Sequence, residues 1–222
     1  MKRAWKPTEQ GMKQFLPLLA ALTLGSNGAS AHPHIFVDMA LKVVVSDPGQ
    51  LQAVEVTWAY DEFYSLLIFE DLGLDSDFDG ELTADELDKL KGFDLQWSEG
   101  FDGDAYLTRN GEALVLGDGE HLETTVSDGR ITTRHRRTLA EPVAADGVVF
   151  KAYDPTYYTA YTLNRGLEVT GSCAGEVTPP DLNSAYDMVE ELLYSKPTDQ
   201  AEEAYPEVGE AFADTVRLSC GA

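Results

Sequence analysis

The stretch HIFVDMALKVVVSDPGQLQAVEVTWAY, residues 34–60, decides the fold. Its first half alternates large apolar residues with polar or mixed ones, at Ile35, Val37, Met39 and Leu41. This alternation is typical of a half-buried strand. The turn signal DPGQ at residues 47–50 then separates it from a second alternating segment, residues 51–60. The stretch therefore predicts an antiparallel hairpin at the start of a mainly β domain.

A second stretch, DSDFDGELTADE at residues 75–86, matches the EF-hand calcium-binding loop. Its predicted calcium ligands are Asp75, Asp77, Asp79, Glu81, Thr83 and Glu86. The three Asp carboxylates suit a hard cation that takes roughly six to eight oxygens, with Glu81 offering its carbonyl and Thr83 acting through a water. Gly80 permits the sharp turn, and Glu86 would bind with both oxygens. The alternative is a chance DxDxDG motif on a solvated loop.

Residues 61–98 are predicted to form an EF-hand-like helical insertion around this loop. A capping box, Thr83 with Glu86, begins the helix after it. Before it, residues 61–72 predict a helix whose candidate packing residues are Phe63, Leu66, Leu67, Phe69 and Leu72. Gly73 precedes Asp75 by two residues, so we expect the entering helix to end early and the host domain to hold the loop.

The composition is that of one globular domain with a processed segment: 222 residues, 43% hydrophobic and 25% charged. Lys and Arg number 16 against 39 Asp and Glu, for a net charge of -23. This excess of acids argues against nucleic acid and anionic lipid as partners.

Residues 1–31 predict a secretory signal peptide. A basic start is followed by an apolar run over 15–24 and the cleavage site Ala29-Ser30-Ala31. The apolar run is shorter than the roughly 20 residues that span a bilayer, so we expect no membrane insertion. The predicted product is a single periplasmic α+β domain, residues 32–222.

The two cysteines, Cys173 and Cys220, predict a disulfide in this oxidising compartment. The alternative is a pair of metal-binding thiolates.

Cleavage after residue 31 would leave His32 at the N-terminus, close to His34. Their imidazoles and the free amine suit a transition metal such as Zn²⁺, Ni²⁺, Co²⁺ or Cu²⁺. Pro33 lacks an amide proton, which excludes the square-planar chelate through the second backbone nitrogen. Asp38, on the same strand face as His34, is a further candidate ligand. The alternative is a frayed N-terminus with two solvated histidines.

Further hairpins are predicted at Asn110-Gly111 and at Asp128-Gly129. The second hairpin carries His121 and His135, two additional candidate metal ligands. A two-residue turn would place them on opposite faces, whereas a bulge would reverse that result. The basic run at residues 134–137 either pairs with nearby acids on a solvated strand or forms a docking or anion site.

The C-terminal third predicts strands at residues 148–153, 167–173 and 215–220, and a helix after residues 179–181. Pairing of the strand 167–173 with 215–220 would bring the cysteines together. The tyrosine-rich segment YDPTYYTAY, residues 153–161, could form an aromatic platform, although cross-strand packing is commoner. The sequence contains no nucleophile motif, Walker A loop or H-E-x-x-H, so we expect no enzymatic activity.

Taken together, these motifs resemble a bacterial family of exported proteins, the domain of unknown function 1007 family. The resemblance rests on HPHIFVD at residues 32–38, DxDxDG at 75–80, YDP at 153–155 and Phe212-Ala213 before Cys220. The family is labelled as a periplasmic component of an uncharacterised ABC-type transport system. Its similarity in context to accessory proteins of nickel, cobalt or zinc transporters implies metal handling, with an inner-membrane transporter as partner.

The expected fold is α+β, a mainly antiparallel β-sheet domain with the helical insertion and a C-terminal helix. The expected function is that of a calcium-binding accessory or binding protein of a transition-metal transport system, with calcium as a structural ion. The rival hypothesis is a calcium-stabilised protein-interaction module that delivers no metal and docks a membrane partner through the basic run and the tyrosines. A hydrolase using calcium is a third class, and it would require a polar pocket.

Overall fold

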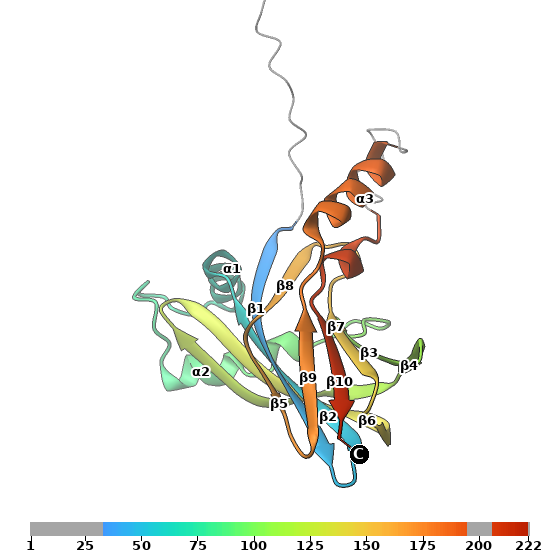
Figure 1. Ribbon diagram of the computed structural model, residues 1–222. Helices are drawn as coiled ribbons and strands as arrows, with labels where there is room; N and C mark the ends of the chain where they lie inside the picture. The colour runs from blue at the N-terminus through green and yellow to red at the C-terminus, as the bar shows by residue number, and fades with distance from the viewer. Residues whose placement is uncertain (1–32, 195–205, 222) are drawn as a thin grey trace, which may run out of the picture. The chain divides into compact units, whose positions relative to one another are not determined.

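Two five-stranded sheets form the body of the protein (Figure 1). The computed structural model describes residues 33–194 and 206–221, which belong to a compact unit of residues 31–222. Sheet A has the order β5-β6-β2-β1-β8, from β1 (Ile35–Ser46), β2 (Gln50–Tyr60), β5 (Leu116–Ser127), β6 (Arg130–Ala144) and β8 (Thr159–Val169). Sheet B has the order β4-β3-β7-β10-β9, from β3 (Ala105–Arg109), β4 (Glu112–Leu114), β7 (Val148–Ala152), β9 (Cys173–Thr178) and β10 (Thr215–Cys220). The prediction of a mainly β-sheet protein is confirmed.

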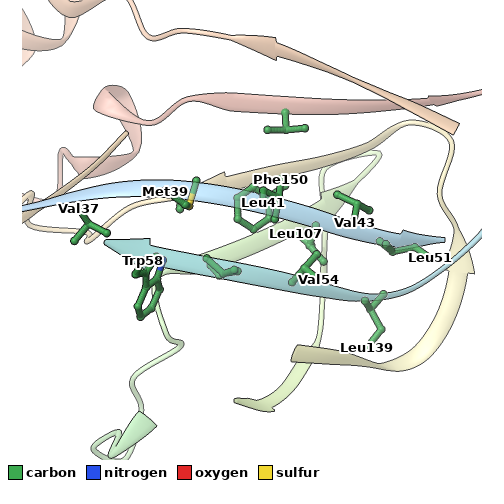
Figure 2. Close-up of a cluster of buried hydrophobic side chains, with 14 of the residues drawn as sticks. Val37, Met39, Leu41, Val43, Leu51, Val54, Trp58, Leu107, Leu139 and Phe150 are labelled. Carbon is green, nitrogen blue, oxygen red and sulfur yellow. The ribbon is translucent and has the colours of Figure 1, made fainter. Parts of the chain in front are cut away.

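The predicted hairpin is β1–β2, the centre of sheet A. The apolar positions of β1 at Val37, Met39 and Leu41 are each 2% exposed. Figure 2 shows Leu41 close to Leu107 and Phe150 of sheet B, and all five residues belong to the same buried cluster. Burial of such a side chain stabilises the fold by about 1.5–3 kcal/mol, so the alternation read from the sequence fixes which face of the hairpin packs.

Helices lie between the second and third strands, as predicted: α1 (Glu62–Leu72), α2 (Ala84–Leu90) and the short 3-10 helix η1 (Phe93–Leu95). The C-terminal helix, α3 (Leu182–Tyr194), is also present, and a 3-10 turn, η2 (Gly209–Phe212), follows it. Gly73 ends α1 in the left-handed conformation, φ 63°, which confirms that the helix ends early. None of the helices in the described ranges is both long and apolar enough to cross a membrane.

The prediction of how α1 packs is largely wrong. Of the five apolar residues expected to pack, only Phe69 is buried, while the others are 41–67% exposed: Phe63, Leu66, Leu67 and Leu72. The inward face instead carries Ser65, whose hydroxyl donates to the Asp61 carbonyl and accepts from the Ile131 amide. A helix that is apolar on every side does not show in its sequence which side faces the core.

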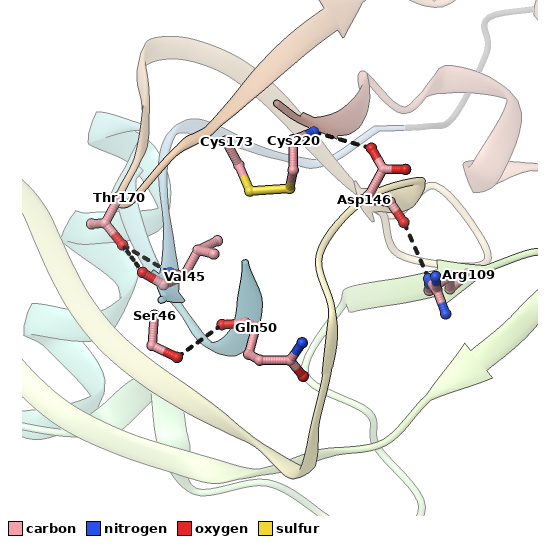
Figure 3. Close-up of a disulfide and its surroundings, with 8 residues drawn as sticks. All are labelled: Val45, Ser46, Gln50, Arg109, Asp146, Thr170, Cys173 and Cys220. Atoms are coloured by element: carbon pink, nitrogen blue, oxygen red, sulfur yellow. Dashed lines mark hydrogen bonds between the residues drawn. A yellow bond between two sulfur atoms is a disulfide. The ribbon is translucent and has the colours of Figure 1, made fainter. Parts of the chain in front are cut away.

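Cys173 and Cys220 form a disulfide (Figure 3), as predicted, but between different strands from those expected. Strand β10 pairs with β9, residues 173–178, and places the two cysteines directly opposite each other. The segment 159–169 belongs to sheet A, where it runs parallel to β1. The chain crosses between the sheets at residues 170–172, where the Thr170 hydroxyl donates to the Val45 carbonyl over 2.9 Å. The expected pairing of 167–173 with 215–220 is therefore corrected.

Candidate functional site

Three carboxylates of the acidic loop converge between α1 and α2. Oxygens of Asp75, Asp77 and Asp79 lie within 4.8 Å of one another. The carboxylate of Asp75, a residue only 6% exposed, accepts from the amides of Asp79 at 3.0 Å and Gly80 at 3.2 Å. The Asp79 carboxylate accepts from the amide of Glu81 at 2.9 Å. The loop therefore holds its own carboxylates in place through backbone amides, with Gly80 at φ 77°.

Glu86, the predicted last ligand of the loop, is not part of this carboxylate cluster. Glu86 uses one carboxylate oxygen to accept from the Asp75 amide at 3.1 Å. Its other oxygen accepts from the amide and the hydroxyl of Thr83, and these bonds hold the pKa of Glu86 below its usual value. Glu81 is exposed. The capping box predicted at Thr83 and Glu86 is confirmed. It engages the Glu86 side chain, which would otherwise be the last ligand of a calcium site.

The domain holds the loop from both ends. Leu74, immediately before it, is 5% exposed, and Leu90, at the end of α2, is fully buried. Leu82 and Leu87 pack against the same core, within and just after the loop. Apolar contacts with the core of the domain thus fix the position of the loop. The loop does not depend on the packing of a pair of helices against each other.

His34, the described member of the histidine pair, lies just before β1 and is exposed; His32 lies outside the described residues. The imidazole ring of His34 contacts the ring of Tyr158, with centroids 4.7 Å apart. The backbone amide of His34 donates to the Tyr158 carbonyl over 2.8 Å. Tyr158 thus contacts both the backbone and the ring of His34. The expectation of a frayed segment does not hold from this residue onward.

Asp61 joins this end of the strand to α1. As the N-cap residue it accepts from the Tyr64 amide at 2.8 Å, and its second carboxylate oxygen accepts from the Phe36 amide at 2.8 Å. His34, Phe36, Asp61, Glu62, Phe63 and Arg130 line one shallow depression. The link to Phe36 has no signal in the sequence, although an Asp directly before a helical pattern is a recognisable capping signal.

Asp38, the further candidate ligand, already has partners for both carboxylate oxygens. One accepts from the Asn164 amide group at 2.6 Å and the other from Arg130 at 3.1 Å. The hydrogen bond from Asn164 is the main reason that the pKa of Asp38 is lowered. This carboxylate therefore braces β1 against its neighbours.

His121 and His135 share a face of sheet A. The Asp128-Gly129 turn has the predicted two-residue geometry, with both φ values positive, but β5 bulges between His121 and Glu123. The bulge places His121 directly opposite His135. Opposite residues of an antiparallel pair point to the same side, so the bulged alternative is the one realised.

These two histidines do not complete a ligand cluster with a third His, Cys, Asp or Glu within the described ranges. His121 shares a hydrogen bond with the Thr124 hydroxyl at 2.9 Å. His135 is fully buried, with Trp58 against its ring at 4.6 Å and its Nδ1 atom 3.6 Å from the Asp94 carboxylate. Asp94, from η1, was not singled out by the sequence because this contact is tertiary.

Asp104 is a second buried carboxylate and is 4% exposed. It accepts from the Tyr161 hydroxyl at 2.8 Å. Burial raises the pKa of Asp104 to about 7.

The basic run mostly pairs with acids, as the simpler interpretation predicted. Arg134 and Arg136 both reach Glu55, at 3.5 and 3.3 Å. Arg137 instead turns inward, donates to the Gly117 carbonyl and lies over the Trp97 ring at 4.9 Å. The run therefore offers few unpaired charges to a docking partner.

The tyrosines of residues 153–161 do not form one platform. Tyr153 stacks on Tyr106, Tyr157 stacks on Phe212, and Tyr161 hydrogen-bonds to Asp104. Each ring packs locally, which is the commoner outcome anticipated from the sequence.

Comparison with known proteins identifies the family. The sequence profile described as "Protein of unknown function (DUF1007)" matches residues 17–220. The chain belongs to this family. No curated protein sequence matches it. Among solved structures it is similar to the acetylcholine-binding protein type 1 of Biomphalaria glabrata, with 11% identity, 89% of each chain covered and a TM-score of 0.32. A likeness this distant supports no argument about function.

Proposed function

We propose that this protein is an exported calcium-binding accessory or binding protein of a transition-metal transport system for nickel, cobalt or zinc. In this proposal calcium braces the loop at residues 75–86, and the transition metal binds at the His32 and His34 end. The observation that carries the calcium part is the convergence of the Asp75, Asp77 and Asp79 carboxylates. The transport context comes from the family resemblance, with an inner-membrane transporter as the partner.

The donor set fits calcium better than a softer metal. Every predicted ligand at residues 75–86 offers oxygen, which Ca²⁺ and Mg²⁺ prefer, and the loop contains no sulfur or imidazole donor. Glu86 would release the Asp75 and Thr83 groups that it now accepts from and turn toward the ion. Bound calcium would relieve the repulsion among three like charges held this close together.

Helix α1 connects the candidate calcium loop to the part of the chain beside His34. Its C-terminus continues through Gly73 and Leu74 into Asp75, and its N-cap, Asp61, holds the Phe36 amide. An ion that fixes the loop would therefore steady both ends of α1 and the strand entrance beside His34. In this role calcium stabilises the structure and does not act as a regulatory signal.

The histidine end offers the softer donors. Imidazole nitrogen suits zinc, nickel and cobalt, and the exposed ring of His34 is accessible to a solvated ion. Glu62 lines the same depression and could supply a carboxylate oxygen. His32 would complete the set if cleavage after residue 31 leaves it with a free amine.

The calcium part is tested by isothermal titration of the exported protein, with the Asp77→Asn variant beside wild type. We expect one site per chain with a dissociation constant of roughly 10⁻⁴ to 10⁻³ M, the range of extracellular modules. The matched control, Asp118→Asn, removes one exposed acid of β5 and should bind as wild type does. Equal calcium binding by the Asp77 and Asp118 variants would refute the assignment.

The transition-metal part needs titrations with zinc, nickel, cobalt and copper, after mass spectrometry has established which residue begins the exported chain. The His32→Ala/His34→Ala variant should lose the tight site, whereas His121→Ala should keep it. If the double variant binds every metal as tightly as wild type, the N-terminal site is wrong. Loss of binding in the His121 variant alone would move the site to the β5–β6 hairpin.

A further inference from the structure

Helix α1 is apolar on both of its sides, and only one side is covered. Phe69 packs in the core, with Tyr64 and Ile68 against it. On the outer side, Phe63 is 67%, Leu66 51% and Leu67 41% exposed. Leu66 and Leu67 lie three and four residues after Phe63, so the three side chains form one continuous outer stripe. A helix that is apolar all round is normally covered on both sides, and large exposed apolar patches mark interaction sites.

The stripe extends beyond the helix. Phe36 of β1 is 55% exposed and lines the same depression as Phe63. Together, Phe36, Phe63, Leu66 and Leu67 form what we call the α1 patch. The depression gives the patch a concave end, into which a side chain of a partner can fit.

The charges around the α1 patch are acidic. Glu70 lies one turn beyond the patch, and Glu62 and Asp71 flank it; all three are exposed, and α1 contains no Lys or Arg. The cation that lines the depression, Arg130, pairs with Asp38 at 3.1 Å. A partner of this surface must therefore bring apolar side chains together with positive charge.

We infer that the α1 patch docks a basic amphipathic helix of a partner protein. Such a helix would lay apolar residues on Phe63, Leu66 and Leu67 and place Lys or Arg beside the surrounding acids. A second copy of this chain would instead set the same acids against each other. An anionic lipid surface would be repelled by these acids and by the net charge of -23. The inference needs neither calcium nor a transition metal at the proposed sites.

The test uses a fluorescein-labelled peptide of about 18 residues, built of Leu and Lys in an amphipathic helical pattern. Its binding to the purified protein is followed by fluorescence anisotropy. The Phe63→Ser/Leu66→Ser variant should bind about tenfold more weakly, because it removes the centre of the contact. The matched control, Val115→Ser/Leu182→Ser, removes two exposed apolar residues elsewhere and should bind as wild type does. Both variants change exposed side chains, so both should fold.

A second pair of matched variants tests the acidic residues around the α1 patch. Glu62→Gln/Glu70→Gln should weaken binding about threefold or more and reduce its salt dependence. Glu112→Gln/Glu176→Gln makes the same change in net charge at exposed sites on β4 and β9 and should have little effect. If both pairs weaken binding equally, the peptide senses only the overall charge and the inference fails.

Three further results would overturn the inference. The first is a failure to bind the Lys peptide more tightly than a peptide in which Glu replaces Lys. The second is binding to anionic phospholipid vesicles that the Phe63→Ser/Leu66→Ser change abolishes, which would make the patch a membrane surface. The third is self-association in sedimentation velocity that the same change abolishes, which would make it a contact between copies.

Discussion

The carboxylate of Asp61 accepts the backbone amide proton of Phe36 over 2.8 Å, and the Asp61 amide donates back to the Phe36 carbonyl over 3.0 Å. The residue that begins α1 is thereby fastened to the strand that follows His34. Because α1 ends three residues before Asp75, one short helix separates the candidate calcium loop from the histidine end.

Asp61→Ala should destabilise the protein by about 2–3 kcal/mol, as measured by urea unfolding. The variant loses the cap on the Tyr64 amide, worth about 1 kcal/mol, and leaves the Phe36 amide without its acceptor. Asp181→Ala is the control, because the Asp181 carboxylate accepts from Ser184 at the start of its own helix. It should lose about 1 kcal/mol or less. Equal losses in the two variants would mean that the bond to Phe36 contributes nothing.

The buried pair of Asp94 and His135 should behave as a coupled unit. Their side chains are 2% and 1% exposed, and removing one leaves the other buried without its counterpart. Asp94→Asn and His135→Gln should each cost about 3–5 kcal/mol. The double variant should be clearly more stable than additivity predicts. Additive losses in a double-mutant cycle would show that Asp94 and His135 do not interact, although the two side chains lie 3.6 Å apart.

Asp104 should make stability fall as the pH rises from about 4 to about 7. Its pKa in the folded protein is about 7, above the model-compound value of 3.8, so the folded state binds the proton more tightly than the unfolded state. The contribution is complete below the unfolded pKa and is lost as the pH passes through the folded pKa, at about 1.4 kcal/mol for each pKa unit.

The Asp104→Asn variant isolates this effect. Asn keeps an acceptor for the Tyr161 hydroxyl and tolerates the left-handed backbone at this position, φ 49°. The difference in free energy of unfolding between variant and wild type should shift in favour of the variant from pH 4 to pH 8. A difference that is constant across this range would contradict the assignment.

The disulfide should contribute to stability without affecting the calcium loop. Cys173 and Cys220 are 47 residues apart, and chain-entropy arguments give about 4 kcal/mol for a loop of this size. The Cys173→Ser/Cys220→Ser variant should unfold at lower urea concentration but titrate calcium with unchanged affinity. Loss of calcium binding in the folded variant would show that the two ends of the domain are coupled.

Local signals in the sequence predicted much of this fold. The alternation through Met39 and Leu41 gave the central hairpin, and Asn110-Gly111 and Asp128-Gly129 gave two further turns, because these signals depend on a few neighbouring residues. Gly73 likewise marked the end of α1. Each of these features is determined by backbone conformation or by burial of one strand face.

The features that were missed depend on contacts between distant segments. The strand of residues 159–169 pairs with β1 and not with residues 215–220. The partner of a strand depends on which sheet edge is open, and the local sequence does not show this. The bulge beside His121 and the approach of Asp94 to His135 have no local pattern. The sequence named the six calcium ligands and predicted the capping box of Thr83 and Glu86, but it did not show that the Glu86 carboxylate also accepts from the Asp75 amide.

The claim that calcium braces the loop is tested most directly by the melting temperature of the purified protein in about 10 mM calcium, which is about 10 to 100 times a dissociation constant of roughly 10⁻⁴ to 10⁻³ M, and in excess chelator. Calcium at roughly 10 to 100 times its dissociation constant stabilises by about 1.4–2.7 kcal/mol, which corresponds to a rise of about 3–10 °C for a domain of this size. Asp77→Asn should abolish most of the rise, and Asp118→Asn should preserve it. The same melting temperature with calcium and with chelator would contradict the claim that an ion at residues 75–86 braces the fold.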